Sequence, residues 1–444
     1  MGPSQSDLSS KPPTDQKLKP THNPTPTLPT EQPSVQPTVA PTKPAAVAMP
    51  TAGVPTLLPT PAATMKPTPE PLSLAEREEI LDEVWKLVND HYLYPDFNGV
   101  NWQAVREEYS QRVAATLTND EFYADVSELI AMLGDQHSRF VPPAAVVNED
   151  AIVTGRETVV GIGILTIPVS DGAFIQMVFP DSPAARADIR PRDRIVAVDG
   201  RPYRIDDGDL HGAAGSKVRL SIVRPSEKVR DVVLVRQEVQ GRIGPTYQRF
   251  PGQIGYVGIS TLWVRDMDEQ VSGALTELVA AGRLSGLILD LRGNLGGWRP
   301  VLSGILSHFV RGQVGKFYSR DRIEPLVITP PAGPDLRGIP MVVLIDRDTS
   351  SYAEVLAAIL QHEAGALVVG TPSAGNTETI YSYQLTDGSR LWLAQEGFRL
   401  QNDVSLEGKG VQPDVIRDVN WKRYSEDDDP QLLEALRLLG AGPK

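Results

Sequence analysis

The spacing of apolar positions divides this chain of 444 residues into stretches of different expected structure. From residue 72 to about 145, apolar residues recur every three or four positions, which predicts an N-terminal helical domain. From 155 to about 240, short runs rich in Val and Ile predict a small antiparallel β domain. From 245 to 444, buried apolar strands alternate with helical patterns, which predicts an α/β core. We therefore expect a multidomain α/β protein.

Residues 1–71 show neither spacing and hold nearly half of the 39 prolines, mixed with Thr, Ser, Gln and Lys. Such a segment cannot bury enough apolar surface to offset its ordering entropy. We expect a disordered, fairly stiff Pro/Thr-rich tether with polyproline II character. Tethers of this kind are common between an envelope anchor and a catalytic body, which favours an extracytoplasmic protein, secreted or tethered to the cell envelope. A proline-motif ligand for another protein is the alternative.

The most informative stretch is residues 341–361, where a strand pattern turns into a helical one. Residues 341–345 are all apolar and predict a strand buried on both faces, and polar residues 346–351 end it. Helical spacing follows, with Glu354 in the first turn, where the helix dipole favours an acid. A hydroxyl at such a corner lies beside unpaired backbone N–H groups, so Ser350 and Ser351 are candidate nucleophiles. The alternative is that both serines only cap the helix.

Composition and charge exclude several classes of function. The chain has no cysteine, which rules out disulfides, thiolate zinc sites and a thiol nucleophile, and its net charge of −13 argues against nucleic acid as a partner. No apolar run approaches the ~18 residues of a membrane span, and the first residues lack the profile of a secretory signal. No cluster has metal-ligand spacing, and we expect neither a metal nor another cofactor.

The predicted β domain, residues 155–240, carries three ordered motifs. They are the loop Gly161-Ile162-Gly163-Ile164, the short helix Ser182-Pro183-Ala184-Ala185, and the strand from Arg194 that ends at Asp199-Gly200. This segment resembles a PDZ domain of the kind found in bacterial proteases, with Asp188 and Arg192 where glycine is usual. The resemblance implies that the N–H groups of residues 161–164 capture a peptide carboxylate while the peptide adds as a strand. A purely structural β unit is the alternative.

The motif Asp290-Leu291-Arg292-Gly293-Asn294-Leu295-Gly296-Gly297 brings in a second resemblance. It resembles the signature of the C-terminal processing (tail-specific) serine peptidases, a family that includes the tricorn-type proteases. Residues 133–142, the PDZ-like segment, residues 349–354 and residues 408–414 fall where that family has them. The resemblance covers everything after the tether. It implies a crotonase- or Clp-protease-like ββα core with the PDZ-like domain inserted between it and the helical domain.

The resemblance assigns roles at the strand-to-helix corner. The family's nucleophile motif lies over residues 349–354, which makes Ser351 the nucleophile and Tyr352 the donor of one oxyanion N–H. The glycine turn Gly296-Gly297 would supply the other, since only glycine lets the backbone come so close to a substrate. Asp290 and Arg292 are expected to shape that loop, and an ordinary ion pair at the end of the strand is the alternative.

The base that would activate Ser351 differs from the one that the resemblance to tail-specific members implies. Tail-specific members use a lysine, but the aligned position here is Asn376, and an amide cannot act as a base. Tricorn-type members use a histidine oriented by a glutamate, and His137 and Glu407 fall at matching positions. The predicted triad is Ser351, His137 and Glu407. Lys409 and Glu378 are weaker substitutes, and structural roles for His137 and Glu407 stay open.

These expectations lead to two hypotheses. The first is a serine endopeptidase that cleaves unfolded or tagged proteins, with the PDZ-like domain binding the substrate C-terminus. The second is an inactive relative that serves as a peptide-binding scaffold, its base lost with the change to Asn376. The partners expected are protein or peptide substrates bound through C-terminal tails, and a homo-oligomer is left open.

Overall fold

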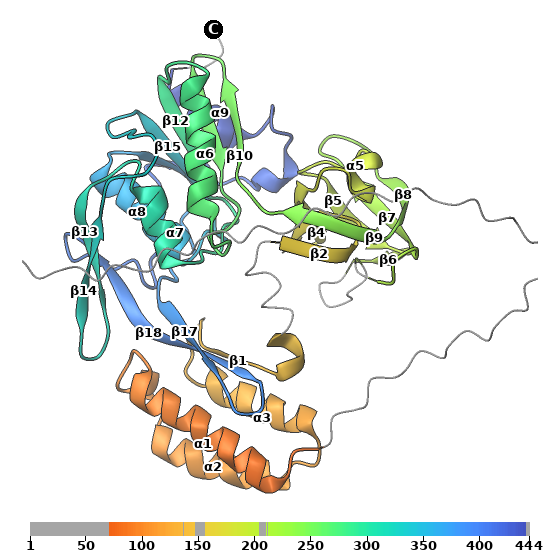
Figure 1. Ribbon diagram of the computed structural model, residues 1–444, viewed down its shortest axis with the longest axis vertical. Helices are drawn as coiled ribbons and strands as arrows, with labels where there is room; N and C mark the ends of the chain where they lie inside the picture. The colour runs from red at the N-terminus through yellow and green to blue at the C-terminus, as the bar shows by residue number, and fades with distance from the viewer. Residues whose placement is uncertain (1–70, 136, 147–155, 204–209, 211, 441–444) are drawn as a thin grey trace, which may run out of the picture. The chain divides into compact units, whose positions relative to one another are not determined.

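The computed structural model describes residues 71–135, 137–146, 156–203, 210 and 212–440. The predicted tether lies outside these residues, except for Pro71. The described residues contain a helical region, a β domain and an α/β core in the expected order (Figure 1). No helix in this part of the chain is long and apolar enough to cross a membrane.

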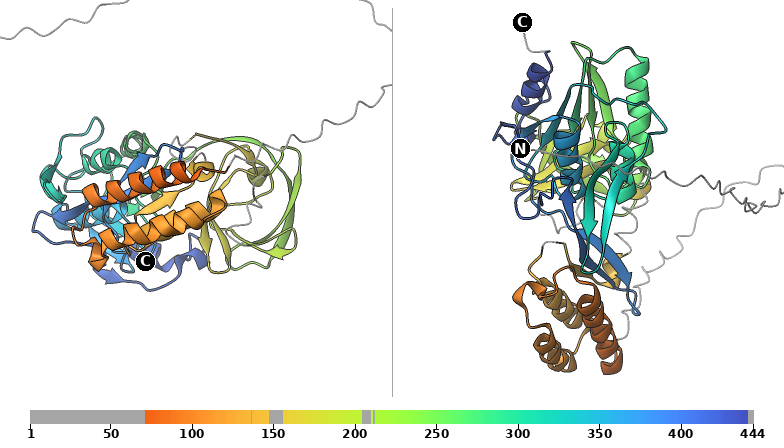
Figure 2. Two further views of the ribbon diagram at one scale, coloured as in Figure 1. Left: turned by 90° about the horizontal axis from the view of Figure 1, so that it is seen from below. Right: turned by 90° about the vertical axis from the view of Figure 1, so that its left-hand side faces the viewer.

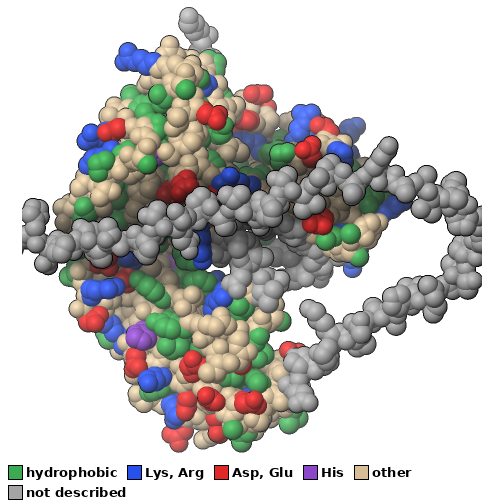
Figure 3. Space-filling view, in the orientation of Figure 1, with side chains coloured by type: hydrophobic (Ala, Val, Ile, Leu, Met, Phe, Trp, Pro, Cys, Tyr) green, Lys and Arg blue, Asp and Glu red, His purple; other side chains and the backbone are tan. Residues whose placement is uncertain are grey.

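Three helices follow one another in the N-terminal region and pack together (Figures 1 and 2): α1 (Leu74–His91), α2 (Trp102–Ala115) and α3 (Asn119–Ala131). Capping boxes at Ser73 and Thr118 begin α1 and α3, because each hydroxyl and the glutamate three residues later satisfy end N–H groups reciprocally. On the face shown in Figure 3, acidic and basic side chains are interspersed over this region.

The helical region shares its core with strands from late in the chain. Leu385, Leu391 and Leu393 belong to the same buried cluster as the apolar faces of the three helices. The short strand β1 (Arg139–Val141) pairs antiparallel with β18 (Arg390–Leu400). The turn around His137 therefore lies between the helices and a sheet of the core.

The β domain contains a main sheet with strand order β3-β4-β5-β7-β8, in which β6 pairs with β5, and a separate β2–β9 ribbon. Its elements are β2 (Arg156–Gly161), β3 (Ile164–Val169), β4 (Gly172–Val178), α5 (Pro183–Arg186), β5 (Arg194–Val198), β6 (Arg201–Pro202), β7 (Lys217–Val223), β8 (Arg230–Val235) and β9 (Gln237–Arg242). Asp188 and Arg192, where the PDZ pattern has glycine, adopt φ values of 54° and 74°. The backbone thus keeps the left-handed conformation that glycine favours.

A six-stranded sheet forms the centre of the α/β core, with order β10-β11-β12-β15-β16-β19 and parallel pairing from β11 onwards. Its strands are β10 (Thr246–Phe250), β11 (Ile254–Gly258), β12 (Gly286–Asp290), β15 (Met341–Ile345), β16 (Leu367–Gly370) and β19 (Val415–Ile416). Helices α6 (Met267–Ala280), α7 (Arg299–Leu306) and α8 (Tyr352–Glu363) share the buried cluster on one face, and α9 (Pro430–Leu438) covers the other.

Successive residues of β12 and β15 face opposite sides of the sheet, and both sides are covered by helices. This explains why residues 287–289 and all of β15 are apolar. Leu287 and Val343 face the cluster with α6–α8, whereas Ile288 and Val342 face α9. A strand covered by helices on both faces needs apolar residues at every position. A second sheet, with order β1-β18-β13-β14 and β17 paired to β18, joins the helical region to this core. It includes β13 (Gly312–Tyr318), β14 (Ile323–Ile328) and β17 (Thr379–Gln384).

The described part of the chain is thus a mixed α/β fold with a helical N-terminal region and a PDZ-like domain. The likeness of the core to the crotonase and Clp-protease folds stays a prediction.

Candidate active site

Ser351 lies at the corner between β15 and α8 in a backbone conformation that few residues adopt. Its φ is 55° and its ψ is −131°. A non-glycine residue there is strained, and such strain concentrates at functional sites. Gly296 packs directly against this corner, since a Cβ atom on Gly296 would lie 2.7 Å from Cβ of Ser351. The glycine is therefore required by space as well as by its own φ of 84°.

Glu354 fixes the corner through four hydrogen bonds. One carboxylate oxygen accepts the N–H of Ser351 at 3.0 Å and that of Asn376 at 2.8 Å. The other accepts the N–H of Gly375 at 2.7 Å and Oγ of Ser373 at 2.5 Å. Burial raises the pKa of Glu354, and these hydrogen bonds oppose the shift. The sequence indicated only an acid favoured by the helix dipole, whereas this carboxylate ties the corner to residues 373–376.

The glycine loop and the corner are joined by the backbone and side chain of Asn294. Its carbonyl accepts the N–H of Ser350 at 2.9 Å, and its Oδ1 accepts the N–H of Gly296 at 2.8 Å. Gly297 approaches Leu262 so closely that a Cβ atom would lie 1.9 Å from that residue's carbonyl carbon. The sequence indicated no role for Asn294 beyond its place in the motif of residues 290–297.

The three predicted oxyanion donors come together, but they are not equivalent. The N–H of Gly296 is engaged by Asn294. Among the described residues, the N–H groups of Gly297 and Tyr352 have no hydrogen-bond partner. The nitrogen of Tyr352 lies 2.9 Å from the position of a Cβ atom on Gly296, so the turn and the start of α8 are adjacent. Gly297 and Tyr352 thus carry free donors beside Ser351.

His137 lies in a tight turn that Asp135 organises. Oδ1 of Asp135 accepts the N–H groups of His137 at 2.9 Å and Ser138 at 2.5 Å, and Oγ of Ser138 accepts the N–H of Ala394 at 3.0 Å. Nε2 of His137 is buried and has no hydrogen-bond partner among the described residues. Burial lowers the pKa of His137, while the charge of Asp135 and hydrogen bonding to Asn376 oppose that shift.

Asn376 is the residue at which the predicted nucleophile and base meet. Its carbonyl accepts the N–H of Ser351 at 2.7 Å. Asn376 also hydrogen-bonds the imidazole of His137, which raises the pKa of that ring. The loop around Asn376, the position at which the family resemblance expects a lysine, therefore contacts both Ser351 and His137.

Glu407 and Glu378 complete the surroundings of this loop. Oε2 of Glu407 accepts the N–H of Thr377 at 2.7 Å and its Oγ1 at 2.9 Å. Glu407 thus contacts the residue after Asn376. Glu378 accepts a hydrogen bond from the hydroxyl of Tyr94. Burial, with Glu407 and Asp135 nearby, raises the pKa of Glu378 to about 7.

The predicted carboxylate-binding loop lies between β2 and β3. The carbonyl of Ile162 accepts the N–H of Ala184 at 3.0 Å, and that of Gly163 accepts the N–H of Phe179 at 3.0 Å. Gly163 has a φ of 81°, and a Cβ atom there would lie 2.2 Å from Cβ of Ser182. The loop from Gly161 to Ile164 therefore packs against the start of α5.

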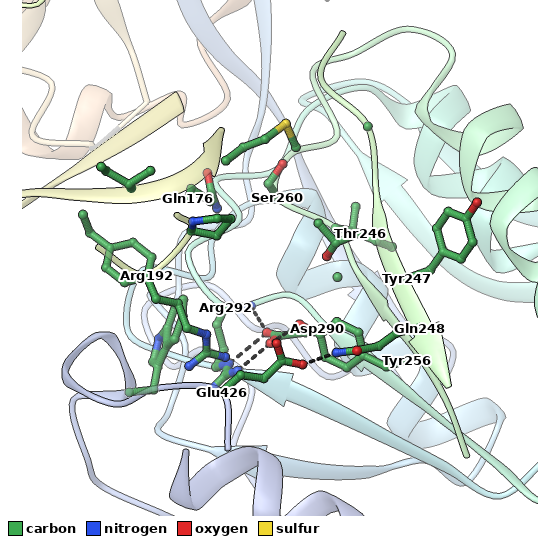
Figure 4. Close-up of a pocket in the computed structure, with 18 residues that line it drawn as sticks. Gln176, Arg192, Thr246, Tyr247, Gln248, Tyr256, Ser260, Asp290, Arg292 and Glu426 are labelled. Carbon is green, nitrogen blue, oxygen red and sulfur yellow. Dashed lines mark hydrogen bonds and ion pairs between the residues drawn. The ribbon is translucent and has the colours of Figure 1, made fainter. Parts of the chain in front are cut away.

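Asp290 and Arg292 form a buried ion pair at the end of β12 (Figure 4). Arg292 also donates to Asp429 at 2.8 Å, and Asp429 accepts from Arg192 of the PDZ-like domain at 3.1 Å. The pair borders a cavity of about 330 Å³ between that domain and the core, which Gln176, Thr246 and Ser260 also line.

No group of three or more His, Cys, Asp or Glu side chains in the described ranges could hold a metal ion. What the site offers is a hydroxyl in a strained corner, free backbone donors beside it and a histidine that reaches the same loop. These are the parts of a serine-type hydrolase.

Comparison with known proteins identifies the class of protein. Residues 253–417 match peptidase family S41, residues 175–224 match a PDZ domain, and residues 73–131 match the tricorn protease C1 domain. The protein is a serine-type peptidase with a PDZ domain. Its residues 253–417 are similar to peptidase family S41, and the relatives that match it are named carboxyl-terminal-processing proteases or peptidases.

Relatives match over most of their length. The carboxyl-terminal-processing protease of Synechocystis sp. is 28% identical over 400 residues, which cover 84% of this chain and 90% of the relative. The chloroplastic carboxyl-terminal-processing peptidase 2 of Arabidopsis thaliana is 28% identical over 78% of this chain and 70% of its own. Among solved structures, the photosystem II D1 C-terminal processing protease superposes with a TM-score of 0.57 at 26% identity, covering 83% of this chain and 98% of that protein.

Proposed function

We propose that this protein is a carboxyl-terminal processing endopeptidase that cleaves unfolded or tagged proteins, and that Ser351 is its nucleophile. His137 acts as the base. The observation that carries the proposal is the position of Asn376, which accepts the N–H of Ser351 at 2.7 Å and acts on the imidazole of His137. One loop residue therefore contacts both the backbone of Ser351 and the imidazole of His137, although it cannot itself take a proton.

In this mechanism Oγ of Ser351 attacks the scissile carbonyl carbon while His137 accepts the hydroxyl proton and returns it to the leaving amine. The unengaged N–H groups of Gly297 and Tyr352 would stabilise the oxyanion, and Gly296 allows the close approach. Glu407 orients His137 indirectly in this proposal. Its carboxylate holds Thr377, and thereby the loop with Asn376 that faces the imidazole.

The proposed role of the PDZ domain is to bind the substrate C-terminus through the loop from Gly161 to Ile164. A free carboxylate would be recognised by its backbone N–H groups while the peptide adds as a strand. Names of the relatives support this substrate class, since each is called a C-terminal processing enzyme. The Pro/Thr-rich composition of residues 1–71 supports an extracytoplasmic location.

The test is labelling of the full chain with a fluorophosphonate probe, followed by mapping of the modified residue, in parallel with cleavage of peptides that carry apolar C-terminal tails. We expect label on Ser351, loss of label and cleavage in Ser351→Ala, and retention of both in the neighbouring control Ser350→Ala. A folded chain that takes no label and leaves every peptide intact would overturn the proposal. If such a chain still bound the tail peptides, the peptide-binding scaffold would be the better description.

A further inference from the structure

The carboxylate that holds the turn of the proposed base belongs to Asp135, whereas the family resemblance indicated Glu407. Glu407 directs its hydrogen bonds to Thr377. Asp135 instead accepts the backbone N–H of His137 at 2.9 Å, from only two residues earlier in the chain. The charge of Asp135 also raises the pKa of His137, against the effect of burial.

We propose that Asp135 is a positioning residue for His137: its carboxylate holds the turn that presents the imidazole and stabilises the imidazolium that forms when Ser351 gives up its proton. This inference rests on the proposed function. In the step itself the proton moves from Oγ of Ser351 to the ring, and Oγ forms its bond to the substrate carbonyl carbon. Asp135 neither accepts nor donates a proton in this step.

Three features of the turn support this role. Oδ1 of Asp135 serves both backbone N–H groups, of His137 and Ser138, so the direction of the turn depends on this side chain. The hydroxyl of Tyr92 also hydrogen-bonds Asp135, which helps to fix the carboxylate. Nε2 of His137 is buried and has no hydrogen-bond partner among the described residues, so it is available to a proton.

The other charged groups around the imidazole favour the neutral ring or act from further away. Arg139, on β1, opposes a positive charge on His137. Tyr92 hydrogen-bonds Asp135, and the charge of Asp135 helps to raise the pKa of Glu378. The charge of Asp135 is therefore the main opposing influence to burial and Arg139.

The experiment compares Asp135→Asn with the matched variant Glu407→Gln in the full chain. Both changes remove a charge and keep an acceptor oxygen for the backbone N–H groups. In Asp135→Asn, we expect the pKa of His137 to fall by about 0.5–1 unit, because a nearby opposite charge favours the charged form. The acidic limb of kcat/KM for a tailed peptide should move to lower pH by the same amount, and kcat on the plateau should fall about tenfold. Glu407→Gln should leave the acidic limb in place.

A readout without catalysis separates this inference from the proposed function. In Ser351→Ala protein with ¹³C-labelled histidine, the ring resonance of His137, assigned through His137→Gln, reports the pKa directly. Asp135→Asn should lower it in that inactive background, even if the chain proves not to cleave peptides. An unchanged value, or a shift produced by Glu407→Gln instead, would overturn the role of Asp135. A purely structural role would lower stability without moving the titration.

Discussion

At the scale of single residues, the site depends on side chains that do no chemistry. Glu354 is fully buried at the start of α8 and satisfies donors from Ser351, Ser373, Gly375 and Asn376. A carboxylate is suited to this task because it has acceptor sites on both oxygens and carries no hydrogen. The strained φ of Ser351 persists because its own N–H is held on both sides, by Glu354 and by the carbonyl of Asn376.

The substitution Glu354→Gln tests this dependence. The amide would point a donor at N–H groups that already donate, which leaves buried donors unsatisfied at about 1–3 kcal/mol each. We expect the free energy of unfolding to fall by about 2–4 kcal/mol and the rate of fluorophosphonate labelling at Ser351 to fall at least tenfold. Chemical denaturation and labelling kinetics measure the two effects.

The control for that substitution is Glu363→Gln, the same change on an exposed residue at the other end of α8. It should change stability by less than about 0.5 kcal/mol and leave labelling unaffected. Equal effects of the two substitutions would mean that the carboxylate of Glu354 does not hold the corner.

At the scale of elements, local patterns predicted much of the fold but little of what joins its parts. A wholly apolar run and the helical spacing after it predicted β15 and α8. The hydrogen bond between Tyr94 and Glu378 joins residues 284 positions apart, and nothing in either neighbourhood indicates it. Such contacts depend on how sheets and helices pack, which periodicity does not encode.

The candidate site shows the same division. The strand-to-helix corner and the glycine turn follow from local chemistry, and their family motif assigned Ser351. The contacts of Asn294 and Glu354 could not be predicted, because each residue has a partner in another loop. The one local signal near the base was Asn376 at the lysine position, and it indicated only that the base had to come from elsewhere.

The contact between Tyr94, in the loop after α1, and Glu378 makes the free energy of unfolding depend on pH. Burial raises the pKa of Glu378 from 4.5 to about 7 in the folded chain. Its contribution to stability is therefore present below about pH 4.5 and is lost as the pH rises through about 7. Glu378→Gln removes that loss while keeping an acceptor for Tyr94. We expect the variant to unfold like the wild type near pH 5, and to be more stable by up to about 3 kcal/mol at pH 8.5.

Tyr94→Phe is the matched test of the same contact. The Tyr94 hydroxyl lowers the pKa of Glu378, so its removal should raise that pKa further and steepen the loss of stability above neutral pH. Denaturant unfolding at pH 5, 7 and 8.5 measures both variants. Parallel pH profiles for wild type and Glu378→Gln would contradict the buried, titrating carboxyl.

At the scale of the whole described chain, one side chain joins the PDZ domain to the peptidase core. Asp429 is fully buried and accepts from Arg192 of the PDZ domain and from Arg292 beside the glycine loop. Its other oxygen caps α9 through the N–H groups of Gln431 and Leu432. The indole of Trp421 lies against both guanidinium groups, at 5.3 Å for Arg192 and 4.2 Å for Arg292.

This arrangement predicts the effect of Asp429→Asn. Asparagine keeps the oxygen that caps α9 but turns an amide N–H₂ toward two guanidinium groups. Removing one member of a buried charge network costs about 3–5 kcal/mol, because the remaining charges stay buried and uncompensated. We expect a loss of this size in the free energy of unfolding, and weaker labelling of Ser351, since Arg292 leads directly into the glycine loop. Asp428→Asn, on the exposed residue next to it, should change neither quantity by more than about 0.5 kcal/mol or twofold. If Asp429→Asn lowered stability but left labelling intact, Asp429 would join the two domains without supporting the catalytic loop.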